Sequence, residues 1–258
     1  MKVPDAGSQE YAAIVQAAAR LYLPAGLYPF FFARGKLSGD PVFAALLSRG
    51  LIPDGARILD LGCGQGLLGA LLIAAQAQFE SGIWPARWPA PPRQWSMAGI
   101  ELRDSLAHRG RVALGSRIRV DTGDVRTAGL PQADIVVVLD VLHYLDAAEQ
   151  QQVLEKITRN LQGGGMLLLR VGDAAAGLRF QITRWVDCLA ASLRYRGGSA
   201  HHYRAAKAWS TARNQMGFQV DSEPMSQGTP FANVLLIARR LPKMADPVLS
   251  ATCQEIQS

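Results

Sequence analysis

A glycine-rich turn between two apolar segments constrains the fold of this chain more than any other feature. It reads Asp60-x-Gly62-x-Gly64-x-Gly66 and begins at the end of residues 57–61, a short run with strand-like composition. A longer apolar pattern with helical spacing begins directly after the last of these glycines. Glycines let a backbone turn sharply and approach a ligand closely, and the start of a helix presents unpaired N–H groups. The segment therefore predicts a strand, a ligand-binding loop and a helix.

The same alternation of short and long apolar segments continues along most of the chain, which predicts an α/β fold with a mainly parallel sheet. The last two expected strands are joined by a short connection and should pair antiparallel as a C-terminal hairpin. Gly163, Gly164 and Gly165 are expected to end the third helix of this series. The expected strands are 57–61, 96–101, 118–122, 135–139, 166–171, 218–221 and 232–239, and the expected helices are 66–77, 103–113, 147–161, 178–195 and 203–216.

An N-terminal helical cap, residues 1–54, is expected to precede this sheet. Residues 10–23 place apolar side chains at helical spacing, and Asp40-Pro41 indicates the start of a second helix. The main domain is expected at 55–241 with a lid-like insertion at 172–203, and 242–258 is expected to be a C-terminal tail. The length of 258 residues is compatible with one such domain and its cap.

Composition and charge argue against several classes of protein. The formal net charge is +6, but the arginines are dispersed and form no dense basic block, so no nucleic-acid partner is predicted. The three cysteines are odd in number and far apart, which predicts neither a disulfide framework nor a zinc site, and no metal is expected. No apolar run is long enough for a membrane helix and no signal peptide is evident, so a cytoplasmic protein without stable membrane insertion is expected. Abundant alanine and arginine suggest a bacterial source.

The glycine turn alone leaves the identity of the ligand open. Gly64-x-Gly66-x-x-Gly69 also fits the dinucleotide-binding fingerprint, so an NAD-dependent oxidoreductase is one alternative. A non-catalytic subunit that binds a cofactor for a partner enzyme is another. Further motifs narrow the choice. Three lie at or after the ends of the second, third and fourth expected strands, one precedes the fifth strand and one lies at the closing hairpin: Glu101, Gly123-Asp124-Val125, Asp140-Val141-Leu142-His143-Tyr144, Leu161-x-Gly163-Gly164-Gly165 and Gly217-Phe218.

Taken together, this series resembles the motifs of class I S-adenosylmethionine-dependent methyltransferases of the small-molecule type, over roughly residues 55–240. The resemblance implies a Rossmann-like seven-strand sheet, an enzyme, and S-adenosyl-L-methionine as cofactor. It implies that the glycine turn holds the methionine and ribose parts, that Glu101 holds the ribose, and that Asp124 and Val125 meet the adenine. Glu101 lies farther from the glycines than usual because of an insertion at 79–95. The full implied cofactor set is Asp60, Gly62, Cys63, Gly64, Gly66, Glu101, Leu102, Asp124, Val125 and Asp140.

Structural roles remain open for the three acids. Asp60 would then brace the turn, Asp124 would be an Asx-turn residue, and Glu101 would pair with the positive end of the following helix.

The acceptor side of the site is less well defined by the sequence. His143, His201 and His202 are candidate general bases, although the first would serve equally well as a pocket wall and the other two as solvated loop residues. Candidate acceptor-binding residues come from the cap and from the lid-like insertion, where core packing is the competing explanation. The expected reaction is O-methylation of a small aromatic or acyl compound, either free or tethered to a carrier, with N- or C-methylation as the alternatives. The sequence leaves the oligomeric state open. The acceptor-binding candidates are Tyr28, Arg34, Lys36, Tyr144, Trp185 and Tyr203.

The tryptophan- and proline-rich part of the insertion, residues 84–95, should lie at the edge of the sheet opposite the cofactor. Its composition fits a loop folded onto its own domain better than a surface for a partner or a membrane.

Overall fold

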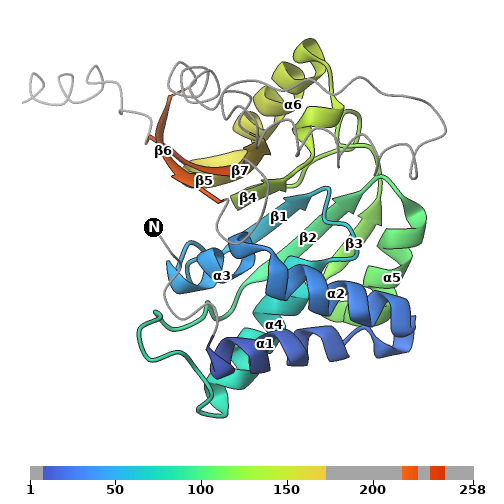
Figure 1. The fold of residues 1–258 in the computed structure, drawn as a ribbon. Helices are drawn as coiled ribbons and strands as arrows, with labels where there is room; N and C mark the ends of the chain where they lie inside the picture. The colour runs from blue at the N-terminus through green and yellow to red at the C-terminus, as the bar shows by residue number, and fades with distance from the viewer. Residues whose placement is uncertain (1–7, 173–216, 226–232, 242–258) are drawn as a thin grey trace, which may run out of the picture.

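A computed structural model describes residues 8–172, 217–225 and 233–241, which form a sheet of seven strands with helices on both faces (Figure 1). The strand order is β3-β2-β1-β4-β5-β7-β6. Neighbours among the first five strands are parallel, whereas β7 is antiparallel to both β5 and β6. The expected Rossmann-like α/β fold with an antiparallel C-terminal hairpin is therefore confirmed. The strands are β1 (Arg57–Leu61), β2 (Ser96–Glu101), β3 (Arg119–Thr122), β4 (Ala133–Leu139), β5 (Leu161–Gly172), β6 (Phe218–Pro224) and β7 (Asn233–Arg240).

The helices form two layers because alternate residues of each strand face opposite sides of the sheet. Ile135 and Val137 of β4 belong to the apolar core shared with the cap, α4 and α5, whereas Val136 and Val138 belong to the core beneath α6. Figure 1 shows α1, α2 and α4 on one side of the sheet and α6 on the other. The α-helices are α1 (Gln9–Arg20), α2 (Leu27–Gly39), α3 (Pro41–Ser48), α4 (Leu67–Glu80), α5 (Asp104–Leu114) and α6 (Ala147–Asn160); short 3₁₀ turns lie at Leu23–Ala25, Gly115–Arg117 and Leu142–Tyr144.

The cap contains three helices, one more than the sequence predicted. Helix α2 was missed because its aromatic residues obscure its periodicity. Its buried face is formed by Pro29, Ala33 and Leu37, which recur every four residues, while Tyr28 and Phe31 are exposed. Tyr11 of α1 donates a hydrogen bond to the carbonyl of Leu37 at 2.8 Å, which joins two of the cap helices.

The glycine triplet was assigned to the end of a helix, and the structure corrects that assignment. Helix α6 ends at Asn160, and the glycines lie inside β5, which begins at Leu161 and is longer than expected. The register between β4 and β5 shifts between Ala133 and Ile135, so the extra residues of β5 are accommodated as a bulge.

The tryptophan-rich insertion folds onto its own domain, as its composition predicted. Trp88 is 5% exposed and its ring lies 5.5 Å from that of Tyr11 in α1. Trp84 packs edge-on against Trp88, and its indole donates to the carbonyl of Pro89 at 3.1 Å. The segment thus packs against α1 of the cap, on the side away from the carboxyl ends of the central strands (Figure 1).

The expected helices 178–195 and 203–216, most of the lid-like insertion 172–203 and the tail 242–258 lie outside the described residues. Among the helices that the structure does describe, none combines the length and apolar character needed to cross a bilayer.

Candidate cofactor and acceptor site

A cavity of about 400 Å³ opens at the carboxyl ends of the central strands. The loop between β1 and α4 forms its floor, and residues of α5 and of the ends of β4 and β5 form its walls. Helix α2 of the cap contributes Tyr28, Phe32 and Lys36 to its lining. Ligands of open α/β sheets bind at this edge, in the crevice outside the carboxyl ends of the strands.

The glycine loop is held in a conformation that only glycine adopts without strain. Gly62, Gly64 and Gly66 have φ angles of +73°, +60° and +79°. A Cβ on Gly62 would lie 2.2 Å from Cγ2 of Val141, whereas one on Gly64 would meet no atom within 4 Å. Gly62 therefore gives the loop close approach to the segment after β4, and the space beside Gly64, which lines the cavity, is open to a ligand.

Glu101, at the end of β2, fastens the glycine loop to the sheet. One carboxylate oxygen accepts from the backbone N–H of Gly64 at 2.9 Å, and the other accepts from that of Arg103 at 3.0 Å. The residue is 8% exposed and lies behind the cavity lining. A carboxylate has about four lone-pair positions, so these two bonds leave acceptor capacity for a ribose. The ribose role of Glu101 stays a prediction.

Asp60, the first residue of the motif, is a buried carboxyl in the cavity lining. Burial, reinforced by the charge of nearby Glu101, raises the pKa of Asp60 to about 7. Burial also raises the pKa of the neighbouring Cys63 thiol well above its ordinary value. A cationic group in the cavity would favour ionised Asp60, which suits the ammonium of an amino-acid cofactor.

Gln65 connects the glycine loop to the cap, a role that the sequence did not suggest. Its side-chain amide donates to the backbone carbonyl of Pro29 in α2 at 3.0 Å, and its backbone carbonyl accepts from the hydroxyl of Tyr22 at 2.8 Å. The residue is 1% exposed, and Oε1 of its side chain has no hydrogen-bond partner among the described residues. A buried acceptor of this kind favours a ligand or water that donates to it.

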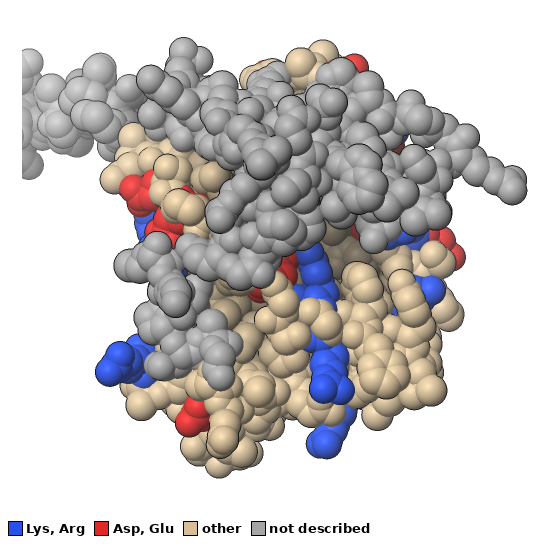
Figure 2. Space-filling model, viewed as in Figure 1, with Lys and Arg blue, Asp and Glu red and all other residues tan. Residues whose placement is uncertain are grey.

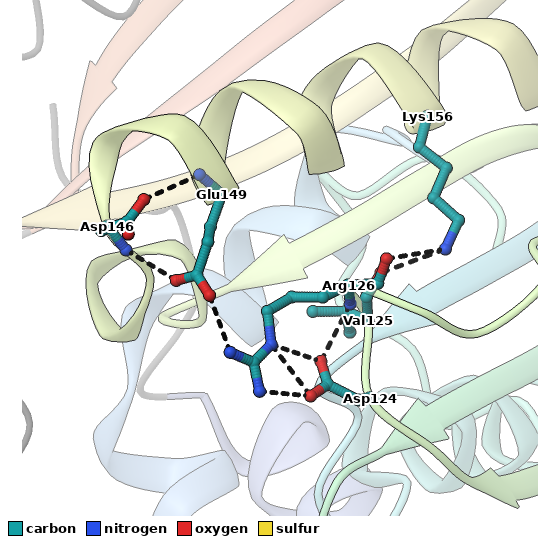
Figure 3. A network of polar contacts seen from close by, with 6 residues as sticks. All are labelled: Asp124, Val125, Arg126, Asp146, Glu149 and Lys156. Carbon is teal, nitrogen blue, oxygen red and sulfur yellow. Dashed lines mark hydrogen bonds and ion pairs between the residues drawn. The ribbon is translucent and has the colours of Figure 1, made fainter.

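Asp124 and Val125 follow β3, and they belong to a polar network with α6 (Figure 3). The Asp124 carboxylate accepts from the Arg126 guanidinium at 2.5 Å, and Arg126 also contacts Glu149 at 2.7 Å. These hydrogen bonds from Arg126 are the main reason that the pKa of Asp124 is lowered. The backbone N–H of Arg126 also donates to Asp124 at 2.9 Å, which is the Asx-turn geometry named above as an alternative. Recognition of adenine by this pair stays a prediction.

Arg170 of β5 is a buried cation in the cavity wall, and no sequence motif indicated its role. Its guanidinium donates to Asp40 at the start of α3 at 2.5 Å and to Asp140 just after β4. Lys36 of α2 also contacts Asp40, at 2.8 Å. Burial opposes ionisation of Asp40, but the charges of Arg170 and Lys36 prevail and lower its pKa to about 2. Asp140 itself has a φ of +58°, unusual for a residue other than glycine.

The structure brings only part of the predicted site into the cavity lining. Of the predicted cofactor residues, Asp60, Gly62, Cys63, Gly64 and Asp140 line the cavity, whereas Gly66, Glu101, Leu102, Asp124 and Val125 are not among its lining residues. Of the predicted acceptor residues, Tyr28 and Lys36 line it, and Arg34 and Tyr144 do not.

The candidate bases are less well placed. His143 is buried in the turn Leu142–Tyr144, outside the set of described residues that line the cavity. His201, His202, Trp185 and Tyr203 lie outside the described residues. Within the part of the chain that is described, no cluster of His, Cys, Asp or Glu has the composition to hold a metal ion.

Comparison with known proteins identifies the fold. The chain resembles a magnesium protoporphyrin IX methyltransferase from Synechocystis with a TM-score of 0.55 and 18% identity, covering 81% of this chain and 87% of that one. It resembles an O-methyltransferase family protein from Burkholderia thailandensis with a TM-score of 0.59 and 17% identity, covering 89% and 64%. At such identities the likeness establishes the fold alone, which is that of class I methyltransferases.

Sequence comparison matches part of the chain to a family model and to two curated proteins. Residues 59–167, from β1 into β5, match the family described as the methyltransferase domain. This match, which covers less than half of the chain, and the fold together support a class I S-adenosylmethionine-dependent methyltransferase. Carboxy-S-adenosyl-L-methionine synthases of Chromohalobacter salexigens and Psychrobacter arcticus are 28% and 29% identical over 120 and 119 residues, or 45% and 44% of this chain. The matched region spans only about 39% and 40% of the length of these two relatives.

Proposed function

We propose that this chain binds S-adenosylmethionine in the cavity and transfers its methyl group to a small-molecule acceptor. The observation that carries the proposal is the glycine loop at the cavity floor, flanked by a buried carboxyl, Asp60, whose ionised form a cationic ligand would stabilise. The family match over residues 59–167 supports the same cofactor.

Each group of the cofactor has a chemically suitable partner. Asp60 and Oε1 of Gln65, which has no partner in the described part of the chain, would accept from the ammonium. The open space at Gly64 would admit the methionine chain. Glu101 would accept from the ribose hydroxyls with its remaining lone pairs. The bound sulfonium supplies an activated methyl group, so the protein's main tasks are to align the acceptor and to exclude water.

The acceptor would enter between α2 and α5, where Tyr28, Phe32 and Leu106 offer apolar surface. We assign O-methylation of a small aromatic or acyl compound, free or carrier-bound, as the reaction that fits such a wall. His143, His201 and His202 remain the candidates for a general base. Replacing His143 with alanine should lower turnover more than cofactor affinity if it is the base, and wild-type turnover would remove it from consideration.

Calorimetry on the purified chain tests the cofactor directly. Near-stoichiometric binding of S-adenosylhomocysteine without binding of NADH is expected, and the reverse preference would indicate an oxidoreductase. Cofactor binding without methyl transfer to any member of a broad acceptor panel would favour the non-catalytic subunit. The cavity-lining variant Gly64→Val, whose side chain would project into the open space beside the loop, should abolish binding.

The two bacterial relatives raise a second candidate, formation of a carboxylated form of the cofactor. Their similarity extends over 45% and 44% of this chain, and the basic residues of the cavity are compatible with an additional carboxylate. Mass spectrometry of the ligand retained by the freshly purified protein would distinguish S-adenosylmethionine from its carboxylated form.

A further inference from the structure

The cavity lining contains more basic than acidic side chains, and the basic side chains differ in whether they contact a carboxylate. Two carboxyl groups, Asp60 and Asp140, line the cavity together with four cationic side chains: Lys36, Arg103, Arg109 and Arg170. Viewed from the side of the cap, Lys and Arg side chains gather in a band over α2 (Figure 2). Burial raises the pKa of Asp60, so this carboxyl is partly neutral near pH 7 and the cationic excess is correspondingly larger.

Three of the four cations already have carboxylate partners. Arg170 contacts Asp40 and Asp140, and Lys36 shares Asp40 with it at 2.8 Å. Arg103 lies 3.7 Å from the carboxylate of Glu101. These charges are neutralised within the protein and have reduced capacity to attract a further anion.

Arg109 of α5 differs from the other three. Within the described residues it makes no ion pair; its guanidinium carbon lies 5.2 Å from the ring centroid of Tyr28 in α2. The nearby Asp104 of the same helix is bonded instead to Arg111 at 2.9 Å and to Thr122 at 2.7 Å. A guanidinium over an aromatic face keeps its edge N–H groups available for a bidentate contact with an anion.

The aromatic residues beside Arg109 extend this arrangement. Tyr28 stacks on Phe32, with ring centroids 6.2 Å apart and an angle of 22° between the planes. Both rings line the cavity, and they are 66% and 37% exposed. A planar apolar group could lie against these rings while a carboxylate on it meets the guanidinium.

The geometry points to an acceptor that is a small aromatic carboxylic acid, held by Arg109 through its carboxylate and by Tyr28 and Phe32 through its ring. This assignment rests on the proposed methyltransferase function and narrows it to a substrate class. Arg109 is here a specificity-determining residue, distinct from the groups assigned to the cofactor.

The test compares matched acids and amides, 4-hydroxybenzoate with 4-hydroxybenzamide and salicylate with salicylamide. Binding to the full chain saturated with S-adenosylhomocysteine is measured by calorimetry, and turnover of each pair is measured with S-adenosylmethionine. The acids should bind at least tenfold more tightly than their amides, because a charge-assisted contact replaces a neutral one. Equal binding of acid and amide by the wild-type protein would overturn the inference without reference to any variant.

Two arginine variants identify the residue responsible. Arg109→Gln should reduce acid affinity tenfold or more and leave amide affinity within about twofold. Arg119→Gln removes the same charge from β3, outside the cavity lining, and should change neither. An Arg109→Gln protein that retains full preference for the acids would exclude Arg109 as the carboxylate ligand.

The affinity for S-adenosylhomocysteine distinguishes failure of the proposed function from failure of the acceptor assignment alone. If S-adenosylhomocysteine does not bind the wild-type protein, the proposed function fails. If it binds the wild type but its affinity falls in Arg109→Gln as much as that of the acids, Arg109 holds the carboxylate of the cofactor and the acceptor inference fails alone. Phenyl phosphate serves as a further probe. If it binds more tightly than both carboxylic acids, the site prefers a phosphate, and the assignment of an aromatic carboxylic acid as acceptor is overturned.

Discussion

Arg170 of β5 donates a hydrogen bond to Asp40, which stands 130 positions earlier in the chain and caps the first turn of α3. The same guanidinium holds Asp140 at the end of β4. One buried cation thus joins the cap to two adjacent strand ends at the wall of the cavity. Its own side chain is 2% exposed, so the interaction is shielded from solvent.

Removing this cation should destabilise the protein strongly. Arg170→Ala leaves Asp40 and Asp140 without their buried partner, and such a loss costs about 3–5 kcal/mol. Chemical denaturation of wild type and variant measures the change in the free energy of unfolding. Arg93→Ala is the matched control, because it breaks the exposed ion pair with Asp54 and should cost less than about 1 kcal/mol. Equal losses in the two variants would contradict the structural importance of Arg170.

Asp60 should make stability depend on pH near neutrality. Its folded-state pKa of about 7 lies above that of the unfolded chain, so the folded protein binds more protons between the two values. The free energy of unfolding should therefore fall as the pH rises from about 4 to 7 and level off above the folded pKa, by at most about 4 kcal/mol from this group.

The Asp60→Asn variant isolates that contribution, because an amide does not titrate. The difference in unfolding free energy between wild type and variant should change across the window from about pH 4 to 7 and stay constant above it. A difference that is independent of pH throughout would mean that Asp60 titrates normally in the folded protein.

Loss of the Glu101 carboxylate should weaken binding of the cofactor. Glu101→Ala removes an acceptor for the ribose and frees the N–H of Gly64, so affinity for S-adenosylhomocysteine should fall by about 1–3 kcal/mol. Isothermal titration calorimetry provides the measurement. Asp104→Ala removes an exposed carboxylate at the start of α5 and should leave the affinity unchanged. Unaltered binding by Glu101→Ala would reject its assignment.

Two alanine substitutions in the glycine loop should differ in a defined order. Gly62→Ala places a Cβ 2.2 Å from Val141 in addition to the cost of a positive φ, and crowding of this kind costs about 1–3 kcal/mol. Gly64→Ala has a similar φ but no atom within 4 Å, so its folding cost should be limited to the conformational term of about 1 kcal/mol. Thermal or chemical unfolding of the two variants tests the order, and a larger loss for Gly64→Ala would reverse it.

Local sequence patterns were sufficient for the framework of the domain. The strand at 57–61 and the strand at 96–101 were placed at their observed limits, because short apolar runs bounded by glycine or charge define a buried strand directly. The spacing of the glycines also predicted the tight turn after the first strand, because positive φ angles at alternate positions admit few residues other than glycine. Asp60 and Glu101 were named as candidate site residues because they lie at the carboxyl ends of those two strands.

The sequence by itself determined the order of the seven strands along the chain and the position of the glycine loop after β1, because both depend on residues adjacent in the chain. Only the tertiary structure decided that β7 lies between β5 and β6, that Gln65 reaches Pro29, and that Arg170 reaches Asp40. Helix α2 belongs with these, since which of its faces is buried depends on the glycine loop against which it packs. Such contacts join residues that share no local period, so they form only where the folded sheet brings distant segments together.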